Sequence, residues 1–373
     1  MGGFKKIIVG VLTSSRADFG IYLPLLKRMR EDDTIDLRII AFGTHVKPAF
    51  GETKKDILQN GFSIYAEIDS LSNGDLPADI ASGFAQTAEL FGTFWATEKM
   101  DVVFCLGDRF EMAASVISGL PFQIKFAHIH GGETTLGAID NAYRHMISHA
   151  STFHFVTAEA FKTRLEAILD ETKYIAVTGS LSLDNLLSLP LLSKDAFFEK
   201  WQIDLSISSL LVTIHPETIA HEANKRYCAE ALSALTLLAN QFQIIITLPN
   251  ADTMGSIYRN AFIELGKSNP DKIKIIENFG SQSYFTCMKY CALLVGNTSS
   301  GIIEAASFGR YVINLGERQR GRLAGENVIH LPFDAHQIIE ATQTWAGKEY
   351  SGINPYFQPN AAATLLDTLK HWL

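Results

Sequence analysis

The stretch ALLVGNTSSGIIEAASFG (residues 292–309) passes from a short apolar run through a polar turn into a helix-like segment. A nearly continuous apolar run is typical of a strand buried inside a parallel sheet. The turn from Asn297 to Gly301 would then present backbone N–H groups and hydroxyls at a helix N-terminus, where they bind phosphate. The alternative is a serine-rich N-cap with Glu304, on the first turn of the helix, as its capping-box partner. The pattern favours the phosphate site, in which Glu304 accepts hydrogen bonds from a ribose diol.

The same strand–turn–helix pattern recurs along the whole chain. Apolar runs rich in β-branched residues alternate with helix-length segments, which predicts right-handed βαβ units and doubly wound parallel sheets. The pattern restarts near residue 208, after a polar stretch rich in Ser and Leu. The sequence therefore predicts an α/β fold with two Rossmann-like domains, residues 1–180 and 181–357. The predicted strands lie in KKIIVGVLT, DLRIIAFG, DVVFCLGD, KFAHIHGG, FHFVT, YIAVTGS, SLLVTIHP, FQIIITLPN, IKIIENFG, ALLVGNTSS and RYVINLG.

The composition is that of an ordinary globular protein of 373 residues with a net charge of −8. That charge argues against general binding to nucleic acid or to an anionic membrane, although a pocket sets its own local potential. The N-terminal apolar run is interpreted as a buried strand rather than a signal peptide, and there is no run of about eighteen apolar residues that would predict a membrane span. We expect the cysteines to be reduced, buried thiols of a cytoplasmic protein: Cys105, Cys228, Cys287 and Cys291.

Polar and glycine-rich residues gather at the C-terminal ends of the apolar runs. Ligands of open α/β sheets bind outside the carboxyl ends of the strands, so two domains facing each other would place these loops in one cleft. Arg16 would bridge phosphate oxygens there, or pair with Asp18 in solvent. Phe279 would offer a stacking surface to a base, or pack in the core. Other candidates for ligand contact at these ends are His215, Asn250, Arg318, Arg320 and Arg322.

Carboxylates follow two further runs, in LGDRFEMAA (106–114) and HIHGGETTLGAIDN (128–141). Asp108 fits a helix N-cap, a role that explains it unaided. A helix N-cap is a poorer explanation for Glu133, which follows two glycines at the end of its run. Together with Asp140 these carboxylates suit acid/base chemistry, because their surroundings can set their pKa values apart.

Histidines are concentrated in the second of these segments. His128 and His130 alternate with apolar residues, so along a strand they would share one face. With Glu133 they could form a two-histidine, one-carboxylate metal site. No second ligand cluster has metal-ligand spacing, and a phosphate site is already predicted, so we expect these histidines to be polar neighbours of the carboxylates and predict no metal.

Taken together, seven segments in a fixed order resemble the hydrolysing UDP-N-acetylglucosamine 2-epimerases of sialic-acid and legionaminic-acid biosynthesis. The resemblance runs from about residue 5 to residue 332. It implies a glycosyltransferase-B-like fold, with the substrate between two Rossmann-like domains and a C-terminal helix (358–373) that returns to the first domain. The segments are SSRADFGIYLPLLKRM, GTHVKPAFGET, GDRFEMAA, AHIHGGETTLGAIDNAYRHMISHAS, HPET, GNTSSGIIEAASFG and INLGERQRGRLAGENVI.

The resemblance also implies a chemistry. Members of the family remove the C2 proton, expel UDP from C1 to leave a 2-acetamidoglucal, and add water to release a free sugar with inverted C2. Asp108, Glu133 and Asp140 match the acid/base carboxylates, and which of them deprotonates C2 stays open. No metal and no nicotinamide cofactor is implied. The residues implied to hold UDP are Arg16, His215 (also a catalytic candidate), Asn250, Phe279 near uracil, Ser299, Ser300, Gly301, Glu304 on the ribose, and Arg322.

Several alternatives stay open at this level. Non-hydrolysing relatives carry Gln-His-Arg-Glu after the second strand, where this chain reads GTHVKPAFGE, so the hydrolysing reaction is favoured. The expected substrate is UDP-N-acetylglucosamine, which would give N-acetylmannosamine, and the alternative is UDP-N,N′-diacetylbacillosamine. A glycosyltransferase-B transferase or a non-catalytic nucleotide-sugar binder would not need three carboxylates. The relatives imply a homo-oligomer, a dimer or a tetramer.

Overall fold

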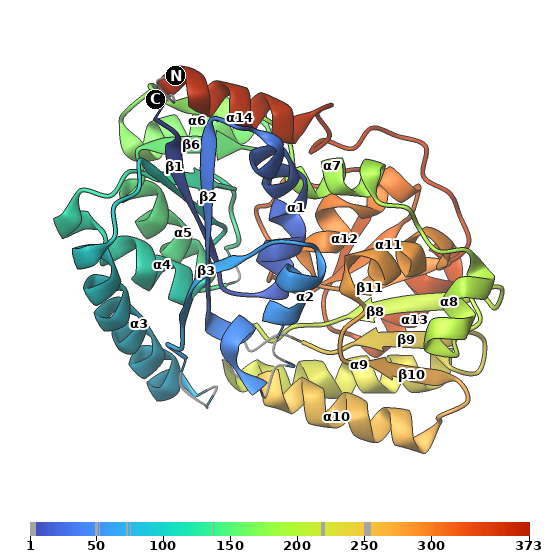
Figure 1. The fold of residues 1–373 in the computed structure, drawn as a ribbon. Helices are drawn as coiled ribbons and strands as arrows, with labels where there is room; N and C mark the ends of the chain where they lie inside the picture. The colour runs from blue at the N-terminus through green and yellow to red at the C-terminus, as the bar shows by residue number, and fades with distance from the viewer. Residues whose placement is uncertain are drawn as a thin grey trace. The chain divides into compact units, whose positions relative to one another are not determined.

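The computed structural model describes residues 5–48, 51, 53–71, 74, 76–136, 138–217, 221–249 and 255–373, except for the side chains of residues 185, 187, 188 and 221. The chain divides into two compact units (Figure 1). The first unit comprises Met1–Glu133, Asp140–Leu187 and Tyr356–Leu373, and the second comprises Thr134–Ile139 and Ser188–Pro355. A short piece of the carboxylate-bearing segment thus belongs to the second unit.

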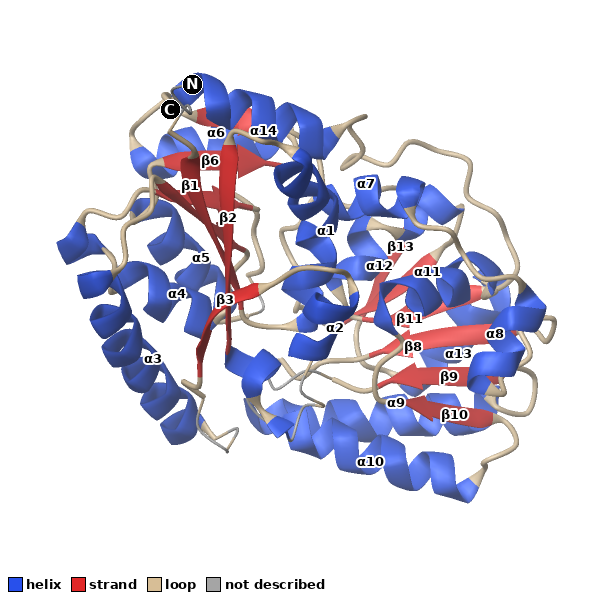
Figure 2. Ribbon diagram, viewed as in Figure 1, coloured by secondary structure: helices blue, strands red, loops and turns tan. Residues whose placement is uncertain are grey.

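Each unit contains one parallel sheet, drawn in red in Figure 2, and this confirms the predicted pair of Rossmann-like domains. The order in the first sheet is β3 (Ile64–Ile68), β2 (Ile35–Phe42), β1 (Ile7–Thr13), β4 (Val102–Leu106), β5 (Phe126–Ile129), β6 (Phe153–Val156) and β7 (Ile175–Val177). The order in the second sheet is β10 (Ile273–Ile276), β9 (Gln243–Thr247), β8 (Ser209–Thr213), β11 (Leu293–Gly296), β12 (Val312–Leu315) and β13 (Val328–Leu331).

Helices form most of the connections between strands in both units, because parallel pairing requires long crossover connections; β12 and β13 are joined by a loop. The first unit has α1 (Arg16–Glu31), α2 (Lys54–Gln59), α3 (Pro77–Thr97), α4 (Phe110–Ile117), α5 (Asp140–His149), α6 (Glu159–Leu169), α7 (Leu181–Ser188), α14 (Ala361–Trp372) and the 3₁₀ turns η1 (Gly43–Val46) and η3 (Leu120–Phe122). The second has α8 (Lys194–Trp201), α9 (Asn224–Leu238), α10 (Gly255–Ser268), α11 (Gly280–Tyr290), α12 (Ser299–Ile303), α13 (Ala335–Trp345), η4 (His221–Ala223) and η5 (Ala305–Phe308).

The continuous apolar runs predict two of the four edge strands, β7 and β10, and miss the other two, β3 and β13. The first four residues of β3 alternate between half-buried and exposed, Tyr65 being 44% exposed, and Ile68 is the buried residue of the strand. No residue of β13 is fully buried. An edge strand is covered on fewer sides than a central one, so its sequence does not need to be apolar throughout.

Strand order reverses once in each sheet, between β1 and β4 and between β8 and β11. In open α/β sheets the crevice at such a switch point is where ligands bind. At the second of these points Gly296 ends β11 with φ +147°, and a Cβ there would lie 1.9 Å from the carbonyl oxygen of Thr213. Only glycine allows this close approach of β11 to β8.

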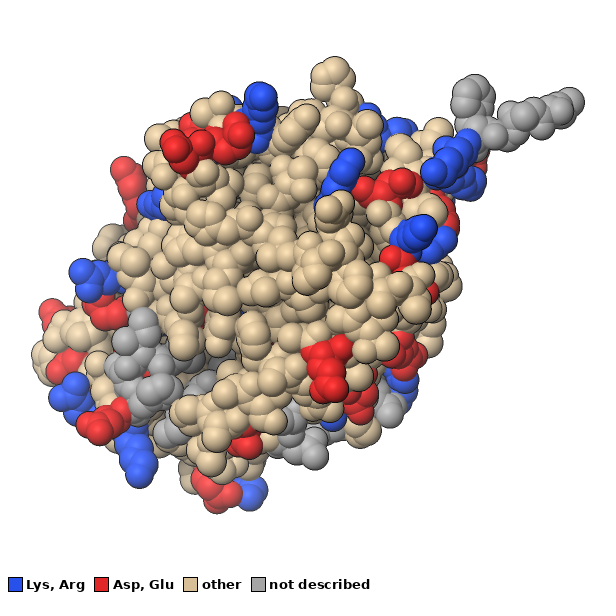
Figure 3. All heavy atoms as spheres, turned by 90° about the vertical axis from the view of Figure 1, so that its left-hand side faces the viewer, with Lys and Arg blue, Asp and Glu red and all other residues tan. Residues whose placement is uncertain are grey.

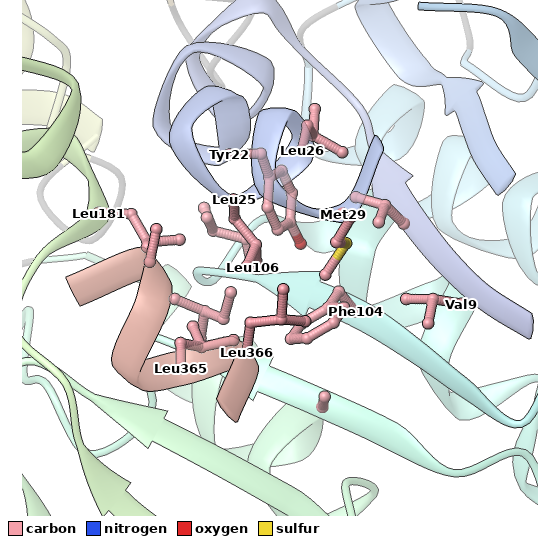
Figure 4. Close-up of a cluster of buried hydrophobic side chains, with 14 of the residues drawn as sticks. Val9, Tyr22, Leu25, Leu26, Met29, Phe104, Leu106, Leu181, Leu365 and Leu366 are labelled. Atoms are coloured by element: carbon pink, nitrogen blue, oxygen red, sulfur yellow. The ribbon is translucent and has the colours of Figure 1, made fainter. Parts of the chain in front are cut away.

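Helix α14 completes the core of the first unit. Its apolar face, Ala361, Ala362, Leu365, Leu366 and Leu369, is buried in one cluster with side chains of α1 and β4. Figure 4 shows Leu365 and Leu366 pointing toward this cluster, and in Figure 1 the red α14 lies beside the blue α1. This confirms the expectation that the C-terminal helix returns to the first domain.

The cysteines are reduced and buried, as expected. Burial raises the pKa of Cys105 and of Cys291 to about 12, so both thiols stay protonated near neutral pH. No helix among the described residues is long and apolar enough to span a bilayer. On the face drawn in Figure 3, acidic and basic side chains are interspersed, and neither kind forms a continuous patch among the coloured atoms.

The packing of α14 predicts a large cost for shortening one of its core side chains. Leu365→Ala should lower the free energy of unfolding by about 2–5 kcal/mol, because it leaves a cavity in the core of the first unit. Leu373→Ala, at the exposed end of the chain, is the matched control and should change it by less than about 0.5 kcal/mol. Urea unfolding followed by tryptophan fluorescence measures both, and equal effects would contradict the packing.

Candidate functional site

Asn297 joins the two strand ends at the switch point of the second unit. Its Oδ1 accepts a hydrogen bond from the His215 backbone N–H at 2.7 Å, and its Nδ2 donates to the His215 carbonyl at 2.9 Å. Both residues are buried, Asn297 completely. This two-point contact fixes the backbone of His215 directly beside the start of α12.

The predicted phosphate turn lies at the N-terminus of α12. Thr298 is the N-cap, and its Oγ1 accepts a hydrogen bond from the backbone N–H of Ser300 at 3.3 Å. Ser299, Ser300 and Gly301 form the first turn, and a Cβ on Gly301 would lie 3.0 Å from a Val312 methyl carbon, so little room is left for a side chain. Serine hydroxyls and first-turn N–H groups therefore meet at the end of β11, as a phosphate site requires.

Glu304 lies elsewhere on this helix than the sequence suggested. The helix has only five residues, and Glu304 is its C-cap rather than part of its first turn. The capping-box alternative is therefore wrong, because the capping side chain is that of Thr298 and the N3 position is Gly301. Glu304 is nevertheless 5% exposed, so its carboxylate is held within the unit.

The arginine-rich loop after β12 contacts the same switch point. Arg318 Nη1 donates to the Pro216 carbonyl at 2.9 Å, and Gln319 Nε2 donates to the Asn297 carbonyl at 2.8 Å. Arg320 forms an exposed ion pair with Glu317 at 3.3 Å, while Arg322 is half-buried. The three arginines thus have different surroundings, and Arg318 holds the loop to the residue after His215.

Phe279 lies three residues after β10 and is the N-cap residue of α11. Its ring is 5% exposed and packs against Trp201 and Phe197, with centroid distances of 4.8 and 5.5 Å. These contacts match the core-packing alternative, and the base-stacking role stays a prediction. Asn250, the other candidate near this edge, lies outside the described residues.

In the first unit, the end of β1 is organised by Asp18. This carboxylate is buried and accepts hydrogen bonds from the backbone and the hydroxyl of both Ser14 and Ser15, at 2.8 to 3.1 Å. Ser15 is the N-cap of α1 and completes a capping box with Asp18. The Asp18 carboxylate therefore fixes the turn that presents Arg16, the first residue of the helix.

A buried guanidinium, that of Arg144 on α5, joins two of the three candidate carboxylates. Arg144 Nη2 donates to Asp108 Oδ2, and Nη1 donates to the His130 carbonyl at 2.8 Å. The same Nη1 lies 3.9 Å from Glu133 Oε2. The side chain of Arg144 is 1% exposed, that of Glu133 is fully buried, and that of Asp108 is 22% exposed. Asp108 is therefore the member of this ion-pair cluster whose side chain is partly exposed to solvent.

The structure contradicts the predicted local role of Asp108 and adds the helical position of Asp140. Asp108 is not a helix N-cap, because Arg109 is the N-cap of α4 and makes no side-chain capping bond. Asp140 is the first residue of α5, one helical turn before Arg144. A carboxylate at a helix N-terminus is stabilised by the helix dipole.

Glu133 has two further contacts through one oxygen. Its Oε1 lies 2.6 Å from His130 Nδ1 and accepts a hydrogen bond from Thr157 Oγ1 at 3.1 Å. Thr157 follows β6, the neighbour of β5 in the sheet, so the contact is one between adjacent strand ends.

The two histidines of this segment do not share a strand face. Strand β5 ends at Ile129, and His130 beyond it has φ +68°, in the left-handed region. His128 is fully buried, with Nδ1 3.0 Å from Ser148 Oγ and Nε2 2.9 Å from the Gly107 carbonyl. Burial lowers the pKa of His128 to about 3, so it is a neutral structural residue. Only His130 contacts a candidate carboxylate.

Arg144 and Thr157 are the members of this cluster that sequence reasoning missed. The available signal was the spacing DNAYR, which places Arg144 four residues after Asp140 and therefore on the same side of a helix. Thr157 had no such signal. Among the described residues, no group of three or more His, Cys, Asp or Glu side chains is arranged to hold a metal.

Comparisons with known proteins agree with this architecture. A family model described as UDP-N-acetylglucosamine 2-epimerase matches residues 27–370. Polysialic acid biosynthesis protein P7 of Escherichia coli is 32% identical over 379 residues, covering 99% of this chain and 94% of that protein. UDP-N,N′-diacetylbacillosamine 2-epimerase (hydrolyzing) of Legionella pneumophila is 34% identical over 343 residues, covering 90% and 87%.

Among solved structures, the fold is similar to that of Methanocaldococcus jannaschii UDP-GlcNAc 2-epimerase in complex with UDP-GlcNAc and UDP. The TM-score is 0.82 at 19% identity, covering 98% of this chain and 100% of that one. The family model spans nearly the whole chain, from the last turns of α1 to α14, and includes the switch point between β8 and β11 and the Arg144 cluster. The protein therefore belongs to the UDP-N-acetylglucosamine 2-epimerase family.

Proposed function

We propose that this chain is a hydrolysing 2-epimerase, which converts a UDP-linked 2-acetamido sugar and water into UDP and the free C2-inverted sugar. The observation that carries the proposal is the cluster in which Arg144 holds Asp108 beside Glu133 and His130. It supplies groups that accept and return a proton, at the carboxyl ends of β4 and β5 where ligands of such sheets bind.

The first half of the proposed reaction is an elimination. A base takes the C2 proton, the C2–H electron pair becomes the C1=C2 double bond, and the C1–O bond breaks with its electron pair on departing UDP. The C2 proton is weakly acidic, so its removal is coupled to departure of the diphosphate. Water then adds to the 2-acetamidoglucal, with hydroxide at C1 and a proton on the opposite face of C2. The carboxylates Asp108, Glu133 and Asp140 are the residues proposed to support these proton transfers.

The second unit supplies the proposed nucleotide site. Ser299, Ser300 and the Gly301 backbone would donate to the diphosphate, with His215 fixed beside them by Asn297. Donors aimed at a leaving group stabilise the charge that develops on it. Arg322 is the proposed cationic partner of the phosphates in this unit, Glu304 the partner of the ribose, and Phe279 the neighbour of the uracil. Arg16, the first residue of α1 in the first unit, is a further proposed phosphate ligand.

Release of UDP, rather than reversible epimerisation, is supported by the segment after β2. Non-hydrolysing relatives have Gln-His-Arg-Glu at this place, whereas this chain has GTHVKPAFGE. His45 in that segment is fully buried, with Nε2 2.9 Å from Thr13 Oγ1 and Nδ1 2.9 Å from Thr53 Oγ1. Burial lowers its pKa to about 4, so it is a neutral structural residue near pH 7.

The proposed substrate is UDP-N-acetylglucosamine, which would give N-acetylmannosamine. UDP-N,N′-diacetylbacillosamine is the second candidate, because a relative 34% identical to this chain carries the name of that activity. The E. coli relative, named for polysialic acid biosynthesis, supports the first candidate.

Turnover in deuterated water tests the proposal. Incubation with each UDP-sugar, without acceptor or added metal, should release UDP and a free 2-epimerised sugar that carries deuterium at C2, since the proton returned to C2 comes from solvent. NMR of the products measures both. Turnover only when an acceptor alcohol is added would instead indicate a glycosyltransferase, and epimerised UDP-sugar without UDP release would indicate a reversible epimerase.

Glu133→Gln should retain UDP binding and lose at least about 100-fold in kcat, because it removes a charge from the acid/base cluster while leaving the second unit unchanged. Titration calorimetry with UDP and a steady-state assay of UDP release measure the two effects. Glu159→Gln, an exposed glutamate at the start of α6, is the matched control and should keep wild-type kcat. Wild-type kcat in Glu133→Gln would remove Glu133 from the mechanism.

Activity should withstand metal removal. The groups proposed to neutralise the leaving diphosphate are arginine, histidine and serine side chains and backbone N–H groups, so dialysis against EDTA should leave kcat unchanged. The rate of UDP release before and after dialysis measures this. A loss of rate that Mg²⁺ or Zn²⁺ restores would show that a metal ion takes part.

A further inference from the structure

Three features of His130 bear on its role in the cluster. It is a non-glycine residue in the left-handed region, with φ +68°. Its side chain is buried, with the residue 5% exposed. Its Nδ1 lies 2.6 Å from Glu133, whereas its Nε2 has no hydrogen-bond partner among the described residues. Strained backbone and an unsatisfied buried polar atom are both costly, and both gather at functional sites.

The contacts of Glu133 determine which nitrogen of His130 carries the proton. Glu133 Oε1 accepts a hydrogen bond from Thr157, and Oε2 lies 3.9 Å from the Arg144 guanidinium, which is always charged. Both contacts favour the ionised carboxylate, which can only accept hydrogen bonds. The short contact to His130 therefore requires a proton on Nδ1. In the neutral imidazole Nε2 then carries the lone pair.

A lone pair at Nε2, with a carboxylate behind Nδ1, is the arrangement of a general base. The carboxylate fixes the tautomer and the ring orientation, and it stabilises the imidazolium that forms when Nε2 takes a proton. Glu133 Oε1 is engaged by His130 and Thr157 and its Oε2 lies near Arg144, whereas His130 Nε2 has no hydrogen-bond partner among the described residues. Glu133 is therefore placed to act through His130 rather than directly on a ligand.

We propose that His130 is the catalytic base that removes the C2 proton, and that Glu133 is a positioning residue that acts through it. The inference rests on the proposed function, and it assigns to His130 the proton abstraction that the resemblance had left open among three carboxylates. In the step, the Nε2 lone pair takes the C2 proton, the C2–H electron pair becomes the C1=C2 double bond, and the C1–O pair leaves with UDP. The imidazolium is held by ionised Glu133.

The position offers a variant suited to testing this role. Glycine adopts positive φ without strain, and the backbone contacts of His130, from its N–H to Phe155 and from its carbonyl to Arg144, do not need a side chain. His130→Gly should keep UDP binding and lose about 100- to 10,000-fold in kcat for UDP release. The space it leaves beside Glu133 matches imidazole, so added imidazole should restore turnover and C2 deuteration in deuterated water.

Gln123→Gly is the matched control. Gln123 also has positive φ, 56°, but lies exposed on the turn before β5. This control tests whether relieving backbone strain at a positive-φ position is enough to change catalysis. The kcat of Gln123→Gly should equal that of the wild type with or without imidazole.

A double variant tests how Glu133 acts. If Glu133 works only through His130, His130→Gly/Glu133→Gln should be no slower than His130→Gly alone, although Glu133→Gln alone is impaired. Imidazole should restore the double variant less well than the single one, because the carboxylate that orients the ring is missing. A further large loss of kcat in the double variant, with UDP binding intact, would overturn the positioning role of Glu133.

The outcomes separate the two proposals. No UDP release by the wild type from either UDP-sugar would overturn the proposed function, and this inference with it. Release by the wild type and also by His130→Gly at a similar rate would overturn the inference alone. A loss in His130→Gly that imidazole does not restore, while UDP still binds, would likewise overturn the role of His130 as base.

Discussion

The buried guanidinium of Arg144 is the constraint on which the site of the first unit depends. A charge removed from water is tolerated only when opposite charge and hydrogen-bond acceptors surround it. Arg144 meets this requirement with Asp108 after β4, the carbonyl of His130 after β5, and Glu133 two glycines further on. A single side chain on α5 therefore determines how the loops after β4 and β5 lie relative to each other.

The same constraint explains why the two carboxylates beside Arg144 differ in their surroundings. The enclosed carboxylate, Glu133, is held by neighbours on two strand ends, whereas Asp108 keeps part of its side chain in solvent. Two carboxylates bound to one cation thus have different access to a ligand. Different surroundings are what allow chemically identical groups to take different roles in proton transfer.

In the second unit the corresponding constraint is steric. Gly296 lets β11 approach β8 so closely that the Asn297 amide can bind both backbone groups of His215. The Gln319 side chain then binds the Asn297 carbonyl and attaches the arginine loop. The Asn297 bridge and the phosphate turn therefore both depend on the close approach of two adjacent parallel strands, β11 and β8.

The sequence by itself determined the fold class, most of the strands and the family, because buried parallel strands need continuous apolar runs and the motifs keep their order. It did not predict the edge strands β3 and β13, whose half-exposed residues carry no such signal. It also gave Asp108 and Glu304 the wrong local roles, since a cap is decided by where a helix begins. Only the tertiary structure brought Arg144 and Thr157 to Glu133, and only it separated His128 from His130. Those contacts join residues up to 24 positions apart in different segments of the chain, and no local pattern encodes them.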